Sequence, residues 1–266
     1  MQIIYAVTSL SFAGLLLGLI VAAAAKYLTV EHESRIPLIT GVLPGANCGG
    51  CGFVGCADYA AAIVNGGAPI GLCHVAGSAA AKSIADIMDT REEYTKPLRA
   101  VVLCCGVAQS AKVRYNYHGD ADCVGANLLG GGPKACQFGC IGYKTCVKAC
   151  PFNAIDIKDG VAVINENCTA CGVCLSACPK KLIKLVPRDT EYTVKCVATH
   201  KGRELRDKCT AGCIACGICE RSCPTGAMSI NNNIAAINYE KCAKCGKCAE
   251  QCPTETVKGG KERFLP

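Results

Sequence analysis

The chain has 266 residues, enough for one to three small domains, and it contains 25 Cys, only four His and no Trp. The Cys count is odd and most Cys residues fall in closely spaced runs, so a secreted disulfide scaffold is not expected. The formal net charge of +7 counts every thiol as neutral. Thiolates that bind metal would offset this charge, so it does not indicate a nucleic-acid partner.

The first segment, from Ile3 to Ala25, carries no charged side chain. As a helix it would span about 34 Å, which is enough for the hydrocarbon core of a bilayer. We therefore predict a transmembrane helix in residues 1–26 that crosses the cell (inner) membrane once. No Lys or Arg precedes the apolar segment, which disfavours a cleaved signal peptide. Lys26 and Arg35 follow it, which predicts that the bulk of the chain lies on the cytoplasmic side.

Residues 27–96 are predicted to form a small domain with linkers around the sequence LPGANCGGCGFVGC. Its candidate ligands are Cys48, Cys51, Cys56 and Cys73, in the spacing C-x2-C-x4-C-x16-C. This spacing predicts a [4Fe-4S] cluster, because the many glycines let the backbone curl and aim amide N–H groups at the sulfurs. A zinc site is the alternative, although it would favour two close pairs of ligands. The neighbouring His74 is not needed as a ligand.

Four runs of Cys, each ending in Cys-Pro, occupy the second half of the chain. They are Cys136, Cys140, Cys146 and Cys150; Cys168, Cys171, Cys174 and Cys178; Cys213, Cys216, Cys219 and Cys223; and Cys242, Cys245, Cys248 and Cys252. The last three follow C-x2-C-x2-C-x3-C-P, the signature of bacterial two-cluster ferredoxins. We therefore predict one two-cluster unit at residues 136–190, a second at 191–266, and five [4Fe-4S] clusters in the chain.

In this signature the fourth Cys of a run binds the cluster of the partner run. The predicted ligand sets are Cys168, Cys171, Cys174 with Cys150; Cys136, Cys140, Cys146 with Cys178; Cys213, Cys216, Cys219 with Cys252; and Cys242, Cys245, Cys248 with Cys223. An apolar hairpin is predicted between the two runs of each unit. The first would turn at Asp159-Gly160 and the second at the Asn run 231–233.

The first run departs from the signature, because alignment with the third run places Tyr143 opposite Cys216. Cys136 is the obvious substitute for the missing ligand, yet its counterpart Cys209 is spare in the second unit. Residues 97–135 are expected to connect the domains, with a strand at AVVLCC. The unassigned Cys residues are Cys104, Cys105, Cys123, Cys196 and Cys209. Four of these would suffice for a sixth cluster, and the alternative is that they are buried free thiols.

These motifs, in this order, resemble the B subunit of the Rnf complex, an ion-translocating ferredoxin:NAD oxidoreductase. The resemblance covers essentially the whole chain. It implies a translocase subunit that takes electrons from soluble ferredoxin and relays them to membrane and flavin/NAD subunits, without bond-making chemistry of its own. The coupling ion, sodium or proton, stays open. The expected fold is α+β, with one N-terminal transmembrane helix, a small [4Fe-4S] domain and tandem ferredoxin-like units.

Two other functional classes are kept beside this one. One is the electron-input subunit of another membrane redox enzyme, such as a hydrogenase, with the same clusters. The N-terminal helix joined to the first cluster motif disfavours it. A zinc-binding interaction protein is the non-redox alternative, which the Cys-Pro runs disfavour. Two basic segments are candidate docking sites for an acidic ferredoxin, and the alternative is that they are solvated charged surface. They are the group Lys180, Lys181, Lys184 and Arg188, and the tail from Lys258 to Arg263.

Overall fold

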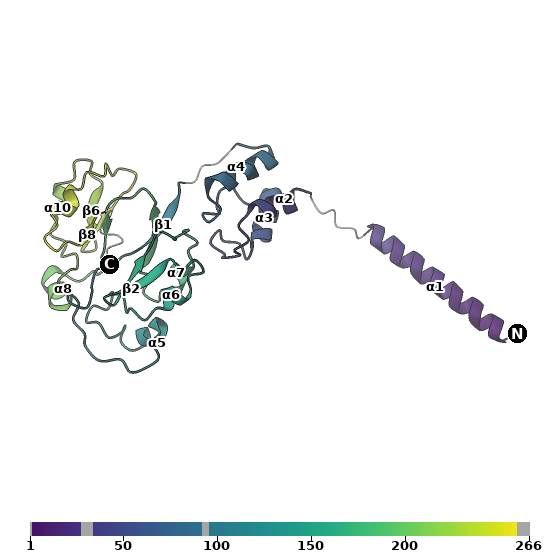
Figure 1. Cartoon of the computed structure of the whole chain (residues 1–266), viewed down its shortest axis with the longest axis horizontal. Helices are drawn as coiled ribbons and strands as arrows, with labels where there is room; N and C mark the ends of the chain where they lie inside the picture. The colour runs from purple at the N-terminus through teal and green to yellow at the C-terminus, as the bar shows by residue number, and fades with distance from the viewer. Residues whose placement is uncertain (1, 28–33, 92–95, 260–266) are drawn as a thin grey trace.

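The computed structural model describes residues 2–27, 34–91 and 96–259. Figure 1 shows three parts in series: a single N-terminal helix, a small helical domain, and a larger C-terminal body of short helices and hairpins. The segment 28–33, part of the segment 86–100 and most of the C-terminal basic tail lie outside the described residues. The four sheets within the described residues have two strands each, so no large sheet organises this chain.

The N-terminal helix α1 spans Gln2–Tyr27 and confirms that the apolar segment is helical. Large apolar side chains such as Phe12, Leu15 and Leu17 are exposed along it. Within the part of the chain that the structure describes, no helix is long and apolar enough to cross a membrane. The transmembrane character predicted for this segment is therefore not confirmed.

Three helices form the N-terminal domain, α2 (Arg35–Val42), α3 (Cys56–Val64) and α4 (Gly77–Met88). Their apolar faces meet in one core that contains Ile39, Tyr59 and Ile84. Cys51, Cys56 and Cys73 pack against the edge of this core. The helices thus support the Gly-rich loop that carries the first group of Cys residues.

The first ferredoxin-like unit contains two antiparallel strand pairs and two short helices. Strand β1 (Leu98–Val102) pairs with β4 (Ile183–Pro187), β2 (Ile155–Lys158) pairs with β3 (Val161–Ile164), and the helices are α6 (Thr145–Lys148) and α7 (Val173–Ala177). Asp159 and Gly160 join β2 to β3 with φ values of 47° and 75°. Two consecutive left-handed residues are what a two-residue hairpin turn requires, so this predicted turn is confirmed.

The second unit repeats this plan. Strand β5 (Thr193–Val194) pairs with β8 (Val257–Lys258), β6 (Met228–Asn231) pairs with β7 (Ile234–Ile237), and the helices are α8 (Gly202–Lys208), α9 (Ile218–Arg221) and α10 (Lys247–Glu250). Asn232 and Asn233 form the turn, with φ values of 48° and 61°. The hairpin predicted at the Asn run is therefore also confirmed.

The segment 97–135 is more than a connection. Its strand β1 belongs to the sheet of the first unit, where Ala100 and Val102 are buried beside Ile155. Helix α5 (Cys123–Leu128) then packs through Cys123 and Ala126 against Ile141. The expected strand thus ends just before Cys104, and the helix carries Cys123 into the first unit.

The buried hydroxyl of Tyr59, a residue only 1% exposed, ties together the loop that leads to Cys73. It donates to the carbonyl oxygen of Pro69 at 2.9 Å and accepts from the amide of Leu72 at 3.1 Å. Replacing Tyr59 with Phe keeps the ring but leaves both backbone groups without this partner.

We expect Tyr59→Phe to lower the free energy of unfolding of the N-terminal domain by about 1–3 kcal/mol, because two half-buried backbone groups lose a hydrogen bond. Denaturant unfolding of the anaerobically purified chain measures this. Val54→Ala, at a side chain 89% exposed, is the control and is expected to change stability by less than about 0.5 kcal/mol. Equal stability of Tyr59→Phe and the control would contradict this role.

Candidate metal centres

Each regular run of Cys bends through two left-handed residues that flank its second Cys. These residues are Ala170 and Gly172, Ala215 and Gly217, and Lys244 and Gly246. The turns curl the backbone, and in the third run Cys213, Cys216 and Cys219 line one cavity. The first run makes the same turns at Gly142 and Lys144. Tyr143 therefore occupies the place of the second Cys, as the alignment predicted.

The four Cys residues of the N-terminal domain line one small cavity together with His74. Burial raises the pKa of Cys73, and the neighbouring thiolates of Cys51 and Cys48 raise it further. Burial also lowers the pKa of His74, which favours its neutral form. The structure thus brings together Cys48, Cys51, Cys56 and Cys73 as the sequence predicted.

Three of the four ferredoxin groups also assemble as predicted. Burial and the thiolates of Cys168, Cys171 and Cys150 raise the pKa of Cys174 to about 12. Burial and Cys213, Cys216 and Cys252 likewise raise that of Cys219 to about 11. Burial raises the pKa of Cys248 beside Cys242, Cys245 and Cys223. In each group the fourth Cys comes from the partner run.

The remaining ferredoxin group contains Cys123 where the sequence predicted Cys136. A single cavity is lined by Cys123, Cys140, Cys146 and Cys178. Burial and the thiolates of Cys140, Cys123 and Cys178 raise the pKa of Cys146 to about 12. Cys136 does not line this cavity and lies in another one, described below.

Hydrogen bonds at the start of α5 explain this exchange. Asp122 caps the helix, accepting from the amide of Gly125 at 2.9 Å and from the Thr145 hydroxyl at 2.6 Å. The Thr145 oxygen in turn accepts from the amide of Cys123 at 2.8 Å. Thr145 directly precedes Cys146, so this network fixes Cys123 beside it. Asp122, a residue type that caps helices, directly precedes Cys123 in the sequence. This was the only sequence signal that Cys123 joins the group.

The other cavity lies between the two units and is lined by Cys104, Cys105, Cys136, Cys196 and Cys209. Burial raises the pKa of Cys136, and the thiolates of Cys104 and Cys209 raise it further. Burial raises the pKa of Cys196 to about 11, despite a hydrogen bond from the backbone of Cys213. Four of the five unassigned Cys residues therefore meet here, and Cys136 takes the place of the fifth, Cys123. We call the five Cys residues of this cavity the central group.

Amide groups point at many of the Cys sulfurs. The amides of Ala154 and Ala227 donate to Cys150 and Cys223 at 3.4 and 3.3 Å, four residues after each sulfur. The amide of Ala100 in β1 donates to Cys168 at 3.4 Å. Such N–H···S bonds favour the thiolate and stabilise an added electron on a cluster. The donor set therefore fits iron–sulfur clusters.

Within the described residues, no three His, Cys, Asp or Glu side chains converge closely enough to enclose one metal ion. The groups above are wider assemblies of sulfurs around a shared space. A four-iron cluster is bound through a different iron by each of its thiolates. The chemistry that the groups offer is therefore binding of a cluster by four thiolates.

Neighbouring groups contact one another across the chain. Cys171 lines the N-terminal cavity, and the carbonyl oxygen of Cys171 lies only 2.1 Å from the place where a Cβ on Gly50 would stand. The thiolate of Cys146 contributes to the raised pKa of Cys174, which burial dominates. The amide of Cys140 donates to the sulfur of Cys104 at 3.3 Å. The N-terminal, first-unit and central groups therefore lie in series.

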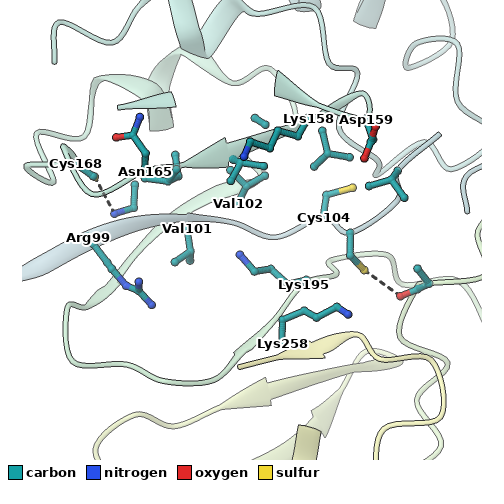
Figure 2. Close-up of a pocket in the computed structure, with 18 of the residues that line it drawn as sticks. Arg99, Val101, Val102, Cys104, Lys158, Asp159, Asn165, Cys168, Lys195 and Lys258 are labelled. Atoms are coloured by element: carbon teal, nitrogen blue, oxygen red, sulfur yellow. Dashed lines mark hydrogen bonds between the residues drawn. The ribbon is translucent and has the colours of Figure 1, made fainter. Parts of the chain in front are cut away.

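A larger cavity of about 680 Å³ lies beside the central group, between β1 and β3 on one side and β8 on the other. Figure 2 shows Lys158, Lys195 and Lys258 around it, with the Cys104 side chain at one end. The sulfur of the neighbouring Cys105 donates to the carbonyl oxygen of Ala211 at 3.0 Å. Three Cys residues line this space, Cys104, Cys105 and Cys168, whereas at least four line each of the cavities described above. It is therefore a different kind of cavity.

The basic group proposed for docking divides in the structure. The ammonium of Lys180 donates to the carbonyl oxygen of Gln137 and is half-buried. Burial lowers the pKa of Lys180, while the thiolates of Cys136 and Cys104 oppose that shift. Lys181 and Lys184 are exposed. Lys180 therefore faces the central group of sulfurs, and the other two lysines face solvent.

Comparison with known proteins agrees with these groups. Residues 43–75 match the FeS family, described as an Fe-S cluster, and residues 139–183 and 212–256 match families described as 4Fe-4S dicluster domains. These matches confirm iron–sulfur and ferredoxin-like domains of mixed helix and strand content.

Curated relatives cover most of the chain. One is the B subunit of the Na(+)-translocating ferredoxin:NAD(+) oxidoreductase complex of Acetobacterium woodii, 46% identical over 86% of this chain and 69% of the relative. A second is the B subunit of the proton-translocating ferredoxin:NAD(+) oxidoreductase complex of Clostridium ljungdahlii, 38% identical over 86% and 82%. A third is the B subunit of an ion-translocating oxidoreductase complex from Methanosarcina acetivorans, 36% identical over 90% and 92%. The chain therefore belongs to the family of B subunits of the ion-translocating ferredoxin:NAD oxidoreductase complexes, the Rnf complexes that its sequence resembles.

Proposed function

We propose that this chain is a one-electron relay that accepts electrons from reduced ferredoxin and passes them to other subunits of an ion-translocating ferredoxin:NAD oxidoreductase. The observation that supports this most strongly is the serial contact between groups of four Cys residues. Each cluster that is bound by such a group takes up and gives back one electron without forming or breaking bonds in a substrate. The membrane and flavin/NAD subunits would complete the reaction.

The proposed ligand sets follow the groups that share a cavity or raise one another's thiol pKa. They are Cys48, Cys51, Cys56 and Cys73; Cys123, Cys140, Cys146 and Cys178; Cys150, Cys168, Cys171 and Cys174; Cys213, Cys216, Cys219 and Cys252; and Cys223, Cys242, Cys245 and Cys248. The thiolates hold the irons, and the amide donors and burial set the potentials. This assignment gives five clusters and moves Cys136 out of the first unit.

The contacts between groups suggest where electrons enter and leave. One end of the series is the N-terminal group, next along the chain to α1. The other end is the group that contains Cys245, which is exposed. Lys241, Lys244 and Lys247 surround Cys245 in sequence and are exposed. A basic surface at an accessible cluster suits an acidic ferredoxin, so we place ferredoxin docking here and not at Lys181 and Lys184.

The direct test of the relay is electron transfer from ferredoxin. The anaerobically purified chain is mixed with an equal amount of reduced ferredoxin in a stopped-flow spectrometer. We expect bleaching of its visible absorbance together with reoxidation of ferredoxin, because electrons move from one set of clusters to the other. A colourless chain, or a coloured chain that ferredoxin does not reduce, would rule out this function.

Charge reversal tests the docking surface. In the variant Lys241→Glu/Lys247→Glu we expect the second-order rate with ferredoxin to fall at least about tenfold at low salt and to depend less on salt, because steering is lost. Lys181→Glu/Lys184→Glu is the matched variant at the other surface, and Lys82→Glu in α4 is a control for net charge. An unchanged rate for the first variant with a slower second one would move the docking site to Lys181 and Lys184.

We propose further that α1 attaches the chain to the cytoplasmic face of the cell (inner) membrane as a single membrane-spanning helix. Its exposed apolar side chains and its lack of charge from Ile3 to Ala25 support this attachment. A Cβ placed on Gly14 or Gly18 would meet nothing within 4 Å, so a helix of another protein in the complex has room to approach there.

Deleting residues 1–27 tests the attachment. We expect the full chain, expressed with its complex, to stay with the membrane pellet after alkaline carbonate washing. The shortened chain is expected to move to the supernatant while it keeps its visible absorbance. Release of the full chain by the same wash would show that α1 does not anchor it.

A further inference from the structure

We propose that Cys104, Cys136, Cys196 and Cys209 hold a sixth [4Fe-4S] cluster, which joins the two ferredoxin-like units electrically. The inference rests on the electron relay proposed above and assigns a metal site to the cavity between the units. That cavity is enclosed by five Cys residues. Four of them are related in pairs by the internal repeat and are the proposed ligands, whereas Cys105 is not.

The internal repeat relates Cys104 of the first unit to Cys196 of the second. Strands β1 and β5 occupy equivalent places, since β1 pairs with β4 five residues after Cys178, and β5 pairs with β8 five residues after Cys252. Cys104 follows the end of β1 by two residues, and Cys196 follows the end of β5 by two residues. Cys104 and Cys196 are therefore equivalent positions.

Cys136 and Cys209 are equivalent as well, because each lies four residues before the first Cys of the aligned runs, Cys140 and Cys213. Each unit thus contributes one Cys after its outer strand and one Cys before its first run. The two pairs meet across the interface between the units. A Cβ on Gly106, which lies in this cavity, would stand 3.4 Å from the Cys209 sulfur and 3.7 Å from the Cys104 sulfur.

Hydrogen bonding distinguishes Cys104 and Cys196 from Cys105. The amide of Cys140 donates to Cys104 at 3.3 Å, and the backbone of the equivalent Cys213 hydrogen-bonds Cys196. The amide of Ala198 adds a second donor to Cys196 at 3.4 Å. The sulfur of Cys105 instead donates its proton to the carbonyl oxygen of Ala211 at 3.0 Å. Cys105 thus acts as a protonated thiol, whereas Cys104 and Cys196 accept hydrogen bonds as cluster ligands do.

Buried positive charge at the same place supports an anionic occupant. Lys134 is 8% exposed, lines the cavity, and donates to the carbonyl oxygens of Gly106 and Gly160 at 2.8 and 2.9 Å. Among the described residues, no carboxylate lies within 4 Å of its ammonium group. Half-buried Lys180 lies near Cys136 and Cys104. A four-iron cluster with four thiolates carries about −2 when oxidised, which matches two ammonium groups.

The position of this site explains its use. Cys104 accepts a hydrogen bond from Cys140 of the first unit, and Cys196 accepts one from Cys213 of the second. A cluster between them would take one electron from the second unit and give one electron to the first. Without it, the two units would have no group of four sulfurs between them in the described part of the chain.

Iron content of alanine variants tests the assignment. For the full chain purified anaerobically we expect about 24 irons and 24 acid-labile sulfides, four of each per cluster. Cys209→Ala is expected to lose about four irons. Cys105→Ala, which removes a sulfur from the same cavity, is the matched control and is expected to lose none.

Double variants distinguish the two assignments of Cys136. If Cys136 and Cys209 bind one cluster, Cys136→Ala/Cys209→Ala loses about four irons, no more than either single variant. If Cys136 serves the first unit, the double variant loses about eight. Cys123→Ala/Cys209→Ala is expected to lose about eight, because these residues serve different clusters. A variant that unfolds would lose far more iron than eight, so misfolding is recognised by the same measurement.

The outcomes separate this inference from the proposed function. About 20 irons in the unaltered chain, unchanged in Cys209→Ala, would overturn the sixth cluster and leave the relay in place. A double variant Cys136→Ala/Cys209→Ala that loses about eight irons would overturn the ligand set. Little iron in the unaltered chain would overturn the relay itself.

Discussion

The bond between iron and buried thiolates is the interaction on which this fold depends. Burial raises the pKa of Cys146 and Cys174 to about 12, which favours the protonated thiols over the thiolates. In the proposed ligand sets, a cluster would replace those protons and would link Cys150 to Cys174, or Cys146 to Cys178, across the chain. The apolar cores around them are small and include the Cys residues themselves. Cluster binding must therefore supply much of the folding energy of the two units.

The local conformation of the Cys runs follows directly from the sequence. Gly172, Gly217 and Gly246 provide left-handed turns, and Asp159-Gly160 closes the first hairpin, so these features were predictable from short-range pattern alone. Three of the four ferredoxin groups followed from the spacing of the runs. The N-terminal group followed in the same way: Cys48 and Cys51 lie in one loop, Cys56 begins α3, and Cys73 lies in the loop that follows this helix.

The choice between Cys123 and Cys136 was not predictable in this way. Both precede Cys140, and the spacing of 13 residues from Cys123 to Cys136 recurs from Cys196 to Cys209. This recurrence suggests equivalent roles, yet Cys104 is the structural counterpart of Cys196. The deciding contacts are the capping of α5 by Asp122 and the hydrogen bonds to Thr145, which span more than 20 residues. The spacing of the Cys residues alone does not predict such a contact.

We propose that the groups of four sulfurs are cluster sites arranged in series, with one between the two units. Anomalous X-ray scattering at the iron absorption edge, on crystals of the anaerobically purified chain, tests this arrangement most directly. We expect iron peaks at the five groups assigned to the N-terminal domain and the ferredoxin-like units, and a sixth peak enclosed by Cys104, Cys136, Cys196 and Cys209. A peak enclosed by Cys136, Cys140, Cys146 and Cys178, with none between the units, would contradict it.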